Sequence, residues 1–528
     1  MSQQLTGLHW IGGRAVAAAA PSLTATNPAT GETLAPQFAE ATRDEVDQAL
    51  RLAEEALPAL QQATPEAIAA LLEDVAGRLA AIAEPLVVRA HAETALPLPR
   101  LQGELARTVN NVRLVAAMVR DGSWRQARID HADPARQPLP KPDVRARLVG
   151  VGPVAVFGAS NFPLAISVAG TDAISAIAAG CPVVVKGHPG HPGTSELAAG
   201  AIVDAVAAAQ LPPGVFALLQ GAGHELGRAL VEHPLTAAVA FTGSLRGGRA
   251  LFDIAAARPR PIPVYAEMGS VNPVFLLPSA LAERGEAIAQ GYIQSVTMGA
   301  GQFCTNPGVV LGVADAALDR FLEATAAACR AATPATMLHQ GIHDAYAAGV
   351  ARWRAIDGVA SLAASQQAPR AERCEAACQI FTAHVALLDR RHELAEEVFG
   401  PASIVLRCDR VEQMYDAARR LEGNLSAAIH GTEAELAEHA ELVRILERKV
   451  GRIVFNGFPT GLEICPSMHH GGPYPATTHS HFTSIGQLAI YRFTRPVCYQ
   501  GFPESALPPE LQDANPRGLR RLVDGRLS

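Results

Sequence analysis

The alternation of hydrophobic and polar positions changes character at about residue 150. From there on, short apolar runs alternate with amphipathic segments, and each run ends at Gly, Pro or a polar turn. This alternation is typical of parallel strands that are covered by helices. The pattern therefore predicts an α/β fold.

A first block of apolar runs predicts one parallel sheet. Its strands are predicted over 153–157, 182–185, 215–219 and 237–241. A helix is predicted over 163–179, because Pro163 is a favourable first helical residue and Gly180 a favourable stop. A second helix is predicted over 195–209.

A second block predicts another α/β unit over about 268–480. Its strands are predicted over 273–277, 308–313, 403–406 and 453–456. A chain of 528 residues exceeds what a single hydrophobic core usually holds, so two large domains are expected. Residues 124–150 contain four prolines between apolar ends and read as an excursion from the globule. Residues 487–500 look strand-like and are expected to pair with the excursion or with another subunit.

Composition narrows the class of protein. Hydrophobic residues make up 49% and charged residues 18%, no long apolar run indicates a membrane span, and the N-terminus lacks a secretory pattern, so a soluble cytoplasmic protein is expected. The net charge of -7 argues against nucleic acid and anionic membranes as partners. The eight cysteines are scattered, which predicts free thiols, and Cys374 with Cys378 lacks a second ligand pair for zinc.

Candidate chemistry centres on a thiol and a carboxylate. Cys304 lies in the run Gly301-Gln302-Phe303-Cys304, and Glu267 follows an apolar stretch in Glu267-Met268-Gly269. A thiol and a carboxylate placed near polar turns suggest a nucleophile and its general base. The alternative interpretation is that Cys304 is a small buried apolar residue without a catalytic role.

A turn rich in small residues follows the strand predicted at 237–241. Thr242-Gly243-Ser244 opens a predicted helix that also contains Gly248. Such a turn lets backbone amides approach a pyrophosphate at the positive end of the helix, although any tight strand-to-helix turn also favours Gly. The common G-x-G-x-x-G fingerprint is missing after the first strand.

Six segments taken together resemble the aldehyde dehydrogenase superfamily in order and spacing. They are Asn27 to Glu32, Ser160-Asn161-Phe162-Pro163, Phe241 to Ser244, Glu267-Met268-Gly269, Gly301 to Cys304, and Glu396 to Pro401. The resemblance implies two Rossmann-like parallel-sheet domains and a small β oligomerisation excursion. It assigns 1–123 with 151–267 to NAD(P) binding, 268–480 to catalysis, and 124–150 with 481–528 to oligomerisation.

The resemblance also implies the roles of three residues. Cys304 would add to the aldehyde carbon, and the Asn161 side chain with the Cys304 backbone amide would hold the oxyanion. Glu267 would accept the thiol proton and activate the water that hydrolyses the thioester. A cysteine hydrolase is the less favoured interpretation, since no histidine is convincingly paired with Cys304 in the sequence. Without the resemblance, Asn161 would be interpreted as a helix cap before Pro163.

Further residues are assigned to the cofactor by the same resemblance. Lys186 would contact the adenosine ribose, Glu397 the nicotinamide ribose with Phe399 packed nearby, and Gly243 with Ser244 the pyrophosphate, while Gly248 would allow close approach. The alternative interpretation is that Lys186 and Glu397 are ordinary surface charges and that the glycines belong to an ordinary strand-to-helix turn.

The loop after Lys186 departs from the common family pattern. Pro189 stands where most relatives carry a glutamate that binds the adenosine ribose. A 2'-phosphate would then meet less repulsion, and His188, His191 or His224 would add partial positive charge. This favours NADP, with NAD or dual use left open.

Other departures point to a branch of the superfamily. Ser270 after Glu267-Met268-Gly269, and His470-Gly471-Gly472 in place of the usual Phe-Gly-Gly, resemble the branch that contains 2-oxoglutarate semialdehyde dehydrogenases and NADP-linked fatty aldehyde dehydrogenases. Arg107 falls where a family helix lines the substrate tunnel and would bind a distal carboxylate. Phe162 would line the same tunnel.

The favoured function is NAD(P)-dependent oxidation of 2-oxoglutarate semialdehyde to 2-oxoglutarate by a homodimer or homotetramer. A medium- or long-chain fatty aldehyde is the alternative substrate. A CoA-acylating enzyme is disfavoured, because Glu267 is needed as a base for water. A structural protein with a silent site is disfavoured by the complete set of nucleophile, base and oxyanion donor.

Overall fold

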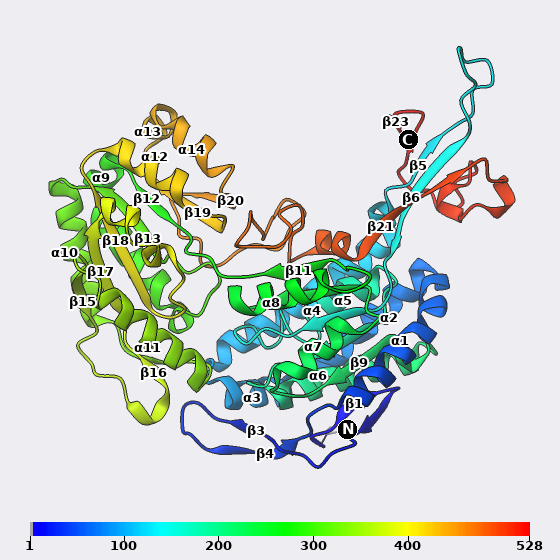
Figure 1. Ribbon diagram of the computed structural model, residues 1–528, viewed down its shortest axis with the longest axis horizontal. Coiled ribbons are helices and arrows are strands. Elements are labelled where there is room, and N and C mark those ends of the chain that lie inside the picture. The colour runs from blue at the N-terminus through cyan, green and yellow to red at the C-terminus, as the bar shows by residue number, and fades with distance from the viewer. Residues whose placement is uncertain (1–3) are drawn as a thin grey trace.

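The computed structural model of the protein describes residues 4–528, in which two seven-stranded sheets each form the centre of a lobe (Figure 1). A five-stranded sheet projects from the first lobe, on the side away from the second lobe. Two short hairpin-like pairs complete the strands, β3 with β4 and β14 with β16. The predicted α/β fold is confirmed.

The first sheet has the order β11-β10-β7-β8-β9-β1-β2, and its first five strands are parallel. The strands of this sheet are β1 (His9–Ile11), β2 (Arg14–Val16), β7 (Val154–Phe157), β8 (Val183–Lys186), β9 (Phe216–Leu219), β10 (Ala238–Thr242) and β11 (Val264–Glu267). Alternate residues of β7 enter two different hydrophobic cores, so both faces of the sheet are buried. This explains why the strands are continuous apolar runs in the sequence.

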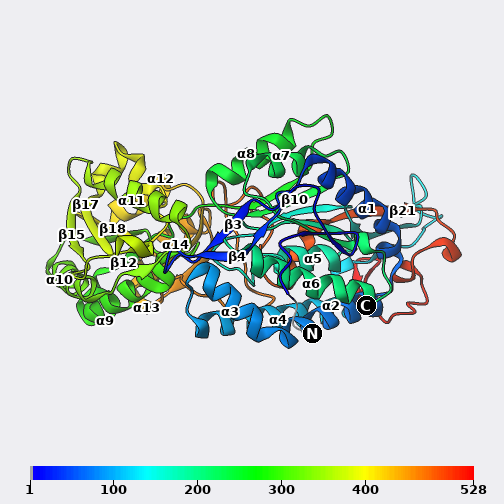
Figure 2. The same ribbon diagram turned by 90° about the horizontal axis from the view of Figure 1, so that it is seen from below.

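Two groups of helices cover these faces. One face packs against α1 (Arg43–Gln62), α7 (His224–Glu232) and α8 (Leu245–Ala256). The other packs against α2 (Pro65–Ala81), α3 (Ala83–Thr94), α4 (Leu98–Asp121), α5 (Thr171–Ala178) and α6 (Pro192–Ala208). The hairpin of β3 (Leu23–Thr26) and β4 (Thr33–Phe38) runs along this lobe toward the second one (Figures 1 and 2).

The prediction of a helix from residue 163 is wrong in its first half. Residues 158–170 form a loop, and α5 begins only at Thr171. The buried carboxylate of Glu104 on α4 accepts hydrogen bonds from the backbone amides of Leu164 (2.8 Å) and Ala165 (3.0 Å). These amides are therefore held by a distant side chain and not by helical carbonyls, and the loop that carries Asn161 is fixed against α4.

The second sheet has the order β15-β17-β18-β13-β12-β19-β20, in which only the edge strand β15 is antiparallel. Its strands are β12 (Val274–Leu276), β13 (Val309–Val313), β15 (Ala360–Ala364), β17 (Gln379–His384), β18 (Ala402–Cys408), β19 (Asn424–His430) and β20 (Val450–Phe455). One face packs on α9 (Pro278–Thr297) and α10 (Ala316–Ala331). The other packs on α11 (Gln340–Arg354), α12 (Val411–Arg420) and α14 (Ala440–Leu446). The short helix α13 (Glu433–Glu438) precedes α14 in the sequence. The short pair β14 (Ala335–Thr336) and β16 (Glu375–Ala376) borders this lobe.

The five-stranded sheet combines the two segments expected to pair. Its strands are β5 (Arg128–Asp130), β6 (Val144–Gly150), β21 (Thr494–Gln500), β22 (Leu522–Val523) and β23 (Arg526–Leu527). The pairing of β21 with β6 confirms that the C-terminal segment joins the excursion. The strand-like interpretation of 487–493 is wrong, because this segment is a 3-10 helix, η7 (Gln487–Phe493), whose Ile490 and Phe493 are buried in the core of the first lobe.

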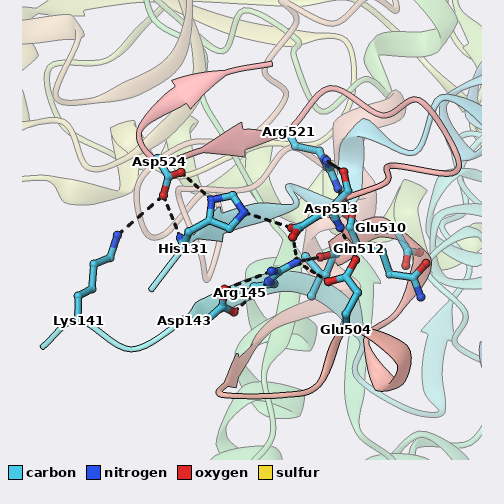
Figure 3. Close-up of polar contacts among 11 residues, drawn as sticks. His131, Lys141, Asp143, Arg145, Glu504, Glu510, Gln512, Asp513, Arg521 and Asp524 are labelled. Carbon is cyan, nitrogen blue, oxygen red and sulfur yellow. Dashed lines mark hydrogen bonds and ion pairs between the residues drawn. The ribbon is translucent and has the colours of Figure 1, made fainter. Parts of the chain in front are cut away.

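Polar contacts hold residues 504–524 against the excursion of residues 124–150 (Figure 3). His131 contacts Asp524 at 2.7 Å and Asp513 at 3.2 Å. Arg145 forms ion pairs with Asp513 (2.7 Å) and Glu504 (3.1 Å). The C-terminal segment therefore caps the β5 side of this sheet and leaves β21 as the strand at the other edge.

The segment between β20 and η7 returns to the first sheet and runs between the two lobes (Figure 1). Thr477 forms an isolated bridge with Glu267, and the Met268 amide donates to the Ala476 carbonyl at 2.8 Å. This return brings residues 470–484 to the end of β11. Within residues 4–528, no helix is both long and apolar enough to cross a bilayer.

Candidate active site

Cys304 lies in a rigid turn between the 3-10 helix η3 (Met298–Gly301) and β13. The side chain of Gln302 donates to the Gly299 carbonyl at 3.0 Å and accepts from the Leu338 amide at 3.0 Å. Asn272 donates to the Cys304 carbonyl at 2.9 Å. These bonds fix the backbone on both sides of the thiol, which is half-buried.

Gly301 is required by this turn for two reasons. Its φ of +69° favours glycine, and a Cβ atom at this position would collide with the backbone of Gly400. The close approach brings the segment that carries Glu397 and Phe399 next to the turn that carries Cys304.

Glu267 ends β11 at the junction of the two lobes, and its side chain is buried. Ser484 donates a hydrogen bond to Oε2 of this carboxylate, and Nε2 of His470 lies 3.2 Å from Oε1. Both partners belong to the segment that returns to β11. The carboxylate expected as the general base is therefore held between two side chains of residues 470–484.

His470 also contacts the nucleophile. Its Nε2 lies 3.3 Å from Sγ of Cys304, so one ring nitrogen is within reach of both the thiol and the carboxylate. The expectation that no histidine is paired with Cys304 is wrong. The sequence did show His470 in place of the usual Phe before Gly471-Gly472. It did not show that this segment returns to β11 and brings the histidine to Cys304.

The surroundings shift the pKa values of Glu267 and Cys304 in opposite directions. Burial raises the pKa of Glu267, but the charge that His470 carries when protonated, its hydrogen bond and the bond from Ser484 outweigh burial and lower this pKa below its ordinary value. Burial and the charge of Glu267 raise the pKa of Cys304 well above its ordinary value. The resting state is therefore a protonated thiol beside an ionised carboxylate, and the thiolate forms only when a neighbouring group takes its proton.

Asn161 lies close to this turn. Its side-chain Nδ2 donates to the Gln302 carbonyl at 3.0 Å, and the residue is 7% exposed. An amide group has two N–H donors, so the second can serve an oxyanion formed at Cys304. Phe162, the next residue, packs edge-to-face on Phe303 with ring centroids 5.4 Å apart. The two aromatic rings thus lie beside the oxyanion donor and the nucleophile.

Arg107 is on the exposed side of α4. Its charge acts on Arg100 and Glu104, which precede it on the same helix. A role in binding the substrate carboxylate stays a prediction for Arg107.

The residues expected to bind the cofactor are at the carboxyl ends of β8 and β10. Lys186 ends β8 and donates to the Gly221 carbonyl at 2.8 Å, and burial lowers its pKa to about 8. Gly243 and Ser244 are exposed at the start of α8, where Ser244 caps the helix by accepting from the Gly247 amide. A Cβ on Gly248 would lie 2.6 Å from Sδ of Met268, so Gly248 lets α8 pack against the residue that follows Glu267. The Gly243 amide already donates to the Glu267 carbonyl at 3.0 Å. The exposed N-terminus of α8 fits a pyrophosphate, and the lysine at the end of β8 fits a ribose.

Glu397 and Phe399 lie half-buried on the catalytic side of the site. Burial and the charge of Glu267 raise the pKa of Glu397 to about 7. Its Oε2 approaches Gly269, where an added Cβ would lie at 2.9 Å. The proposed ribose ligand is therefore within electrostatic range of the catalytic carboxylate.

The histidines after β8 differ from what the sequence suggested. His188 stacks on His191 with centroids 5.3 Å apart and lies 5.8 Å from His339. Burial lowers the pKa of both His188 and His191, so neither adds positive charge at neutral pH. His224 is exposed at the first residue of α7. Of the histidines proposed to favour a 2'-phosphate, His224 keeps that role as a prediction.

The catalytic groups are also a possible set of metal ligands. One atom each of Glu267, Cys304 and His470 lies within 4.8 Å of the others. The same closeness is what proton transfer requires, and the ion pair and thiol contact already give each group a partner.

Comparisons with known proteins agree with this geometry. The model of the aldehyde dehydrogenase family matches residues 16–473. The chain is 50% identical to alpha-ketoglutaric semialdehyde dehydrogenase 2 of Azospirillum brasilense and 45% identical to alpha-ketoglutaric semialdehyde dehydrogenase of Acinetobacter baylyi, with 99% of each chain covered in both cases. Aldehyde dehydrogenase C of Pseudomonas syringae, solved with NAD+ and octanal, has the same fold with a TM-score of 0.79 at 20% identity over 95% of this chain and 98% of that one. The chain belongs to the aldehyde dehydrogenase family.

Proposed function

We propose that this enzyme oxidises 2-oxoglutarate semialdehyde to 2-oxoglutarate with NAD or NADP. The observation that carries the proposal is the convergence of Cys304, Glu267, His470 and Asn161 in one site. Two relatives that match over 99% of the chain bear the name of this activity under its synonym, alpha-ketoglutaric semialdehyde dehydrogenase.

The first step is formation of the thiolate. The sequence predicts Glu267 as the acceptor of the thiol proton, and the thiol is hydrogen-bonded to this carboxylate. In the mechanism proposed here, neutral His470, whose Nε2 is 3.3 Å from Sγ, takes the proton first, and Glu267 at 3.2 Å stabilises the resulting imidazolium. The thiolate forms a bond to the aldehyde carbon, and the Asn161 amide, with the Cys304 backbone amide, donates to the oxyanion. When bound, the nicotinamide supplies the hydride acceptor that turns the thiohemiacetal into a thioester.

Hydrolysis of the thioester uses the same groups in the reverse sense. Glu267 removes a proton from the attacking water, and the hydroxyl oxygen bonds to the acyl carbon. Cleavage of the carbon–sulfur bond releases the thiolate, which recovers its proton from His470. The lowered pKa of Glu267 keeps the base ionised at neutral pH.

The residues present fit a dinucleotide. Lys186 would hold the adenosine ribose, Gly243 and Ser244 the pyrophosphate, and Glu397 the nicotinamide ribose with Phe399 beside it. Pro189 in place of an acidic residue favours NADP, whereas the neutral state of buried His188 leaves His224 as the histidine able to add charge. We therefore propose that both cofactors are used, with NADP preferred.

We also propose a division of the chain into functional parts. Residues 1–123 with 151–267 bind NAD(P), residues 268–480 carry catalysis, and 124–150 with 481–528 mediate assembly into a homodimer or homotetramer in the cytoplasm. The edge strand β21 supports this assembly, as do exposed apolar side chains in the two assembly segments, such as Leu139 (68% exposed) and Leu527 (76% exposed). Light scattering after size exclusion tests the subunit number.

One assay tests the activity. The purified enzyme is mixed with 2-oxoglutarate semialdehyde, succinic semialdehyde or a long-chain aldehyde, each with NAD or NADP, while reduced cofactor is followed at its absorbance. The expected result is the highest kcat/KM for 2-oxoglutarate semialdehyde and loss of turnover in Cys304→Ala. A preference for the long-chain aldehyde would overturn the substrate, and turnover in Cys304→Ala would overturn the nucleophile.

A further inference from the structure

Arg100 lies in the first turn of α4, and its guanidinium is placed against the catalytic turn. Its Cζ atom is 5.2 Å from the centroid of the Phe162 ring and 5.0 Å from that of Phe303. Phe162 follows the oxyanion donor in the sequence, and Phe303 precedes the nucleophile. The guanidinium is thus stacked on the two rings that flank the reacting centre.

The hydrogen bonding of Arg100 is incomplete. Nη2 donates to the Asn161 carbonyl at 2.9 Å, but Nη1 is buried and has no acceptor among residues 4–528. Within the same residues, no Asp or Glu lies at ion-pair distance from Arg100, although the charge of Glu104, one turn along α4, acts on it. A buried donor without an acceptor is costly, and a carboxylate of a ligand would supply that acceptor.

The turn at Gly299 makes room for this guanidinium. Gly299 has a φ of +57°, and a Cβ atom there would lie 2.6 Å from Nη1 of Arg100. A side chain at this position would displace the guanidinium from the rings. Gly299 therefore lets the guanidinium pack closely against the turn that carries the nucleophile.

We propose that Arg100 binds the carboxylate of the substrate and so selects a 2-oxo acid aldehyde. The inference rests on the proposed function, since 2-oxoglutarate semialdehyde carries a carboxylate and a ketone at the end opposite its aldehyde. With the aldehyde carbon at Sγ and its oxygen at Asn161, the remaining carbons must extend past the residues that flank these groups. A guanidinium there presents a planar pair of donors to the carboxylate.

Two other arginines are less suited to this contact. Arg452 is close enough for its charge to act on Cys304, and its Nε is buried without a partner among residues 4–528. Its two Nη groups, however, already donate to the carbonyls of Gly461 and Pro459, so they are not free to form a fork with a carboxylate. Its place is therefore to hold the loop 459–461. Arg107 lies two helical turns beyond Arg100 on α4 and is exposed. Arg113 is also exposed on α4 and has no assigned role in the site, so it provides a matched control on the same helix.

Three aldehydes of equal chain length separate the recognition of each group. They are 2-oxoglutarate semialdehyde, 5-oxopentanoate, which lacks the ketone, and pentanal, which also lacks the carboxylate. In Arg100→Gln we expect kcat/KM to fall by about 10- to 100-fold for both acids, as for loss of a hydrogen bond to a charged group, and to change little for pentanal. Arg100→Lys keeps the positive charge but loses the planar pair of donors, so its kcat/KM for the acids should lie between those of the wild type and Arg100→Gln. Arg113→Gln should resemble the wild type, and Arg107→Gln should lose less kcat/KM for the acids than Arg100→Gln does.

Each contrary result has a separate meaning. Equal losses in Arg100→Gln for pentanal and the acids, with a slower rate of Cys304 alkylation, would show that Arg100 only supports the catalytic turn and would overturn the inference. An unchanged Arg100→Gln beside a defective Arg107→Gln would transfer the role to Arg107. A wild-type enzyme that oxidises pentanal but neither acid would overturn the proposed substrate and this inference together.

Discussion

Replacement of His470 by Phe gives the most direct test of the catalytic site. Phe has a similar shape, and it is the residue that the common family motif carries at this position. The change removes the contact to Sγ of Cys304 at 3.3 Å and the ion pair with Glu267 at 3.2 Å. It leaves the backbone bonds of residue 470, to the Thr483 hydroxyl and from the Ser484 amide, in place.

The size of the effect follows from the distance. A protonated imidazole at 3.3 Å from a thiolate contributes about 5 kcal/mol at an effective dielectric constant of about 20, before the cost of burial. Even if the cost of burial cancels about two thirds of this energy, the remaining about 1.7 kcal/mol shifts the thiol pKa by more than about 1 unit. Removing the ring therefore raises the pKa of Cys304 further, and kcat/KM should fall by about 100-fold, within the range of general base catalysis.

Alkylation of Cys304 by iodoacetamide measures the thiolate directly. The rate is determined by mass spectrometry of the peptide that contains Cys304, across a range of pH, in wild type and His470→Phe. The midpoint of the pH profile should move upward in the variant, because the cation that stabilises the thiolate is absent. The kcat/KM profile should move in the same direction.

His469→Phe is the matched control, since it changes an adjacent histidine that is not part of the contact to Cys304. It should leave the alkylation midpoint at the wild-type value. An unchanged midpoint in His470→Phe, with full activity, would refute the reasoning that His470 shares the thiol proton.

Three further predictions concern the carboxylates and the assembly segments. Glu267→Gln should give one rapid turnover of reduced cofactor and then slow by about 100-fold or more, because the base for water is lost; rapid kinetics would contradict this if no burst is seen. The affinity for NAD(P) should weaken as pH falls through about 7, since protonated Glu397 accepts from a ribose hydroxyl more weakly than the carboxylate does, and Glu397→Gln should flatten the titration of cofactor binding. Asp524 and Asp513 raise the pKa of His131 above 6.5, so this contact stabilises the C-terminal segment at low pH and is lost as pH rises through the raised value. The protection factors for hydrogen exchange of residues 521–528, which correct for the intrinsic effect of pH, should therefore be lower at pH 8 than at pH 6 in the wild type and equal at both in His131→Asn.

The strands could be predicted because their apolar runs carry the information locally. The strand at 154–157, for instance, has both faces buried and needs no partner to be recognised. The helix expected from Pro163 failed for the opposite reason. Glu104 is 60 residues away from Leu164 in the chain, and no local pattern shows that its carboxylate takes the amides that a helix would have used.

The same distinction applies to the site. Cys304, Glu267 and Asn161 stand in motifs, so the order of segments was sufficient to find them. His470 is 166 residues from Cys304, and its contact exists only because the segment after β20 returns to β11. Arg100 gave no motif at all, since its position on the rings of Phe162 and Phe303 depends on how α4 packs against two loops.

The geometry of His470 sets a limit on how the two half-reactions share it. A single nitrogen, Nε2, is close to both Sγ and Oε1. At any moment this nitrogen carries either a lone pair, with which it accepts the thiol proton, or a proton, which it donates to the carboxylate. Before attack on the aldehyde it must accept; once protonated, it turns its N–H toward Glu267. During hydrolysis that proton must return to the departing sulfur, which frees Glu267 from its ion pair as it takes the proton of water. The residue that replaces Phe in this motif therefore couples the protonation of the nucleophile to that of the base, and neither group reaches its reactive state independently of the other.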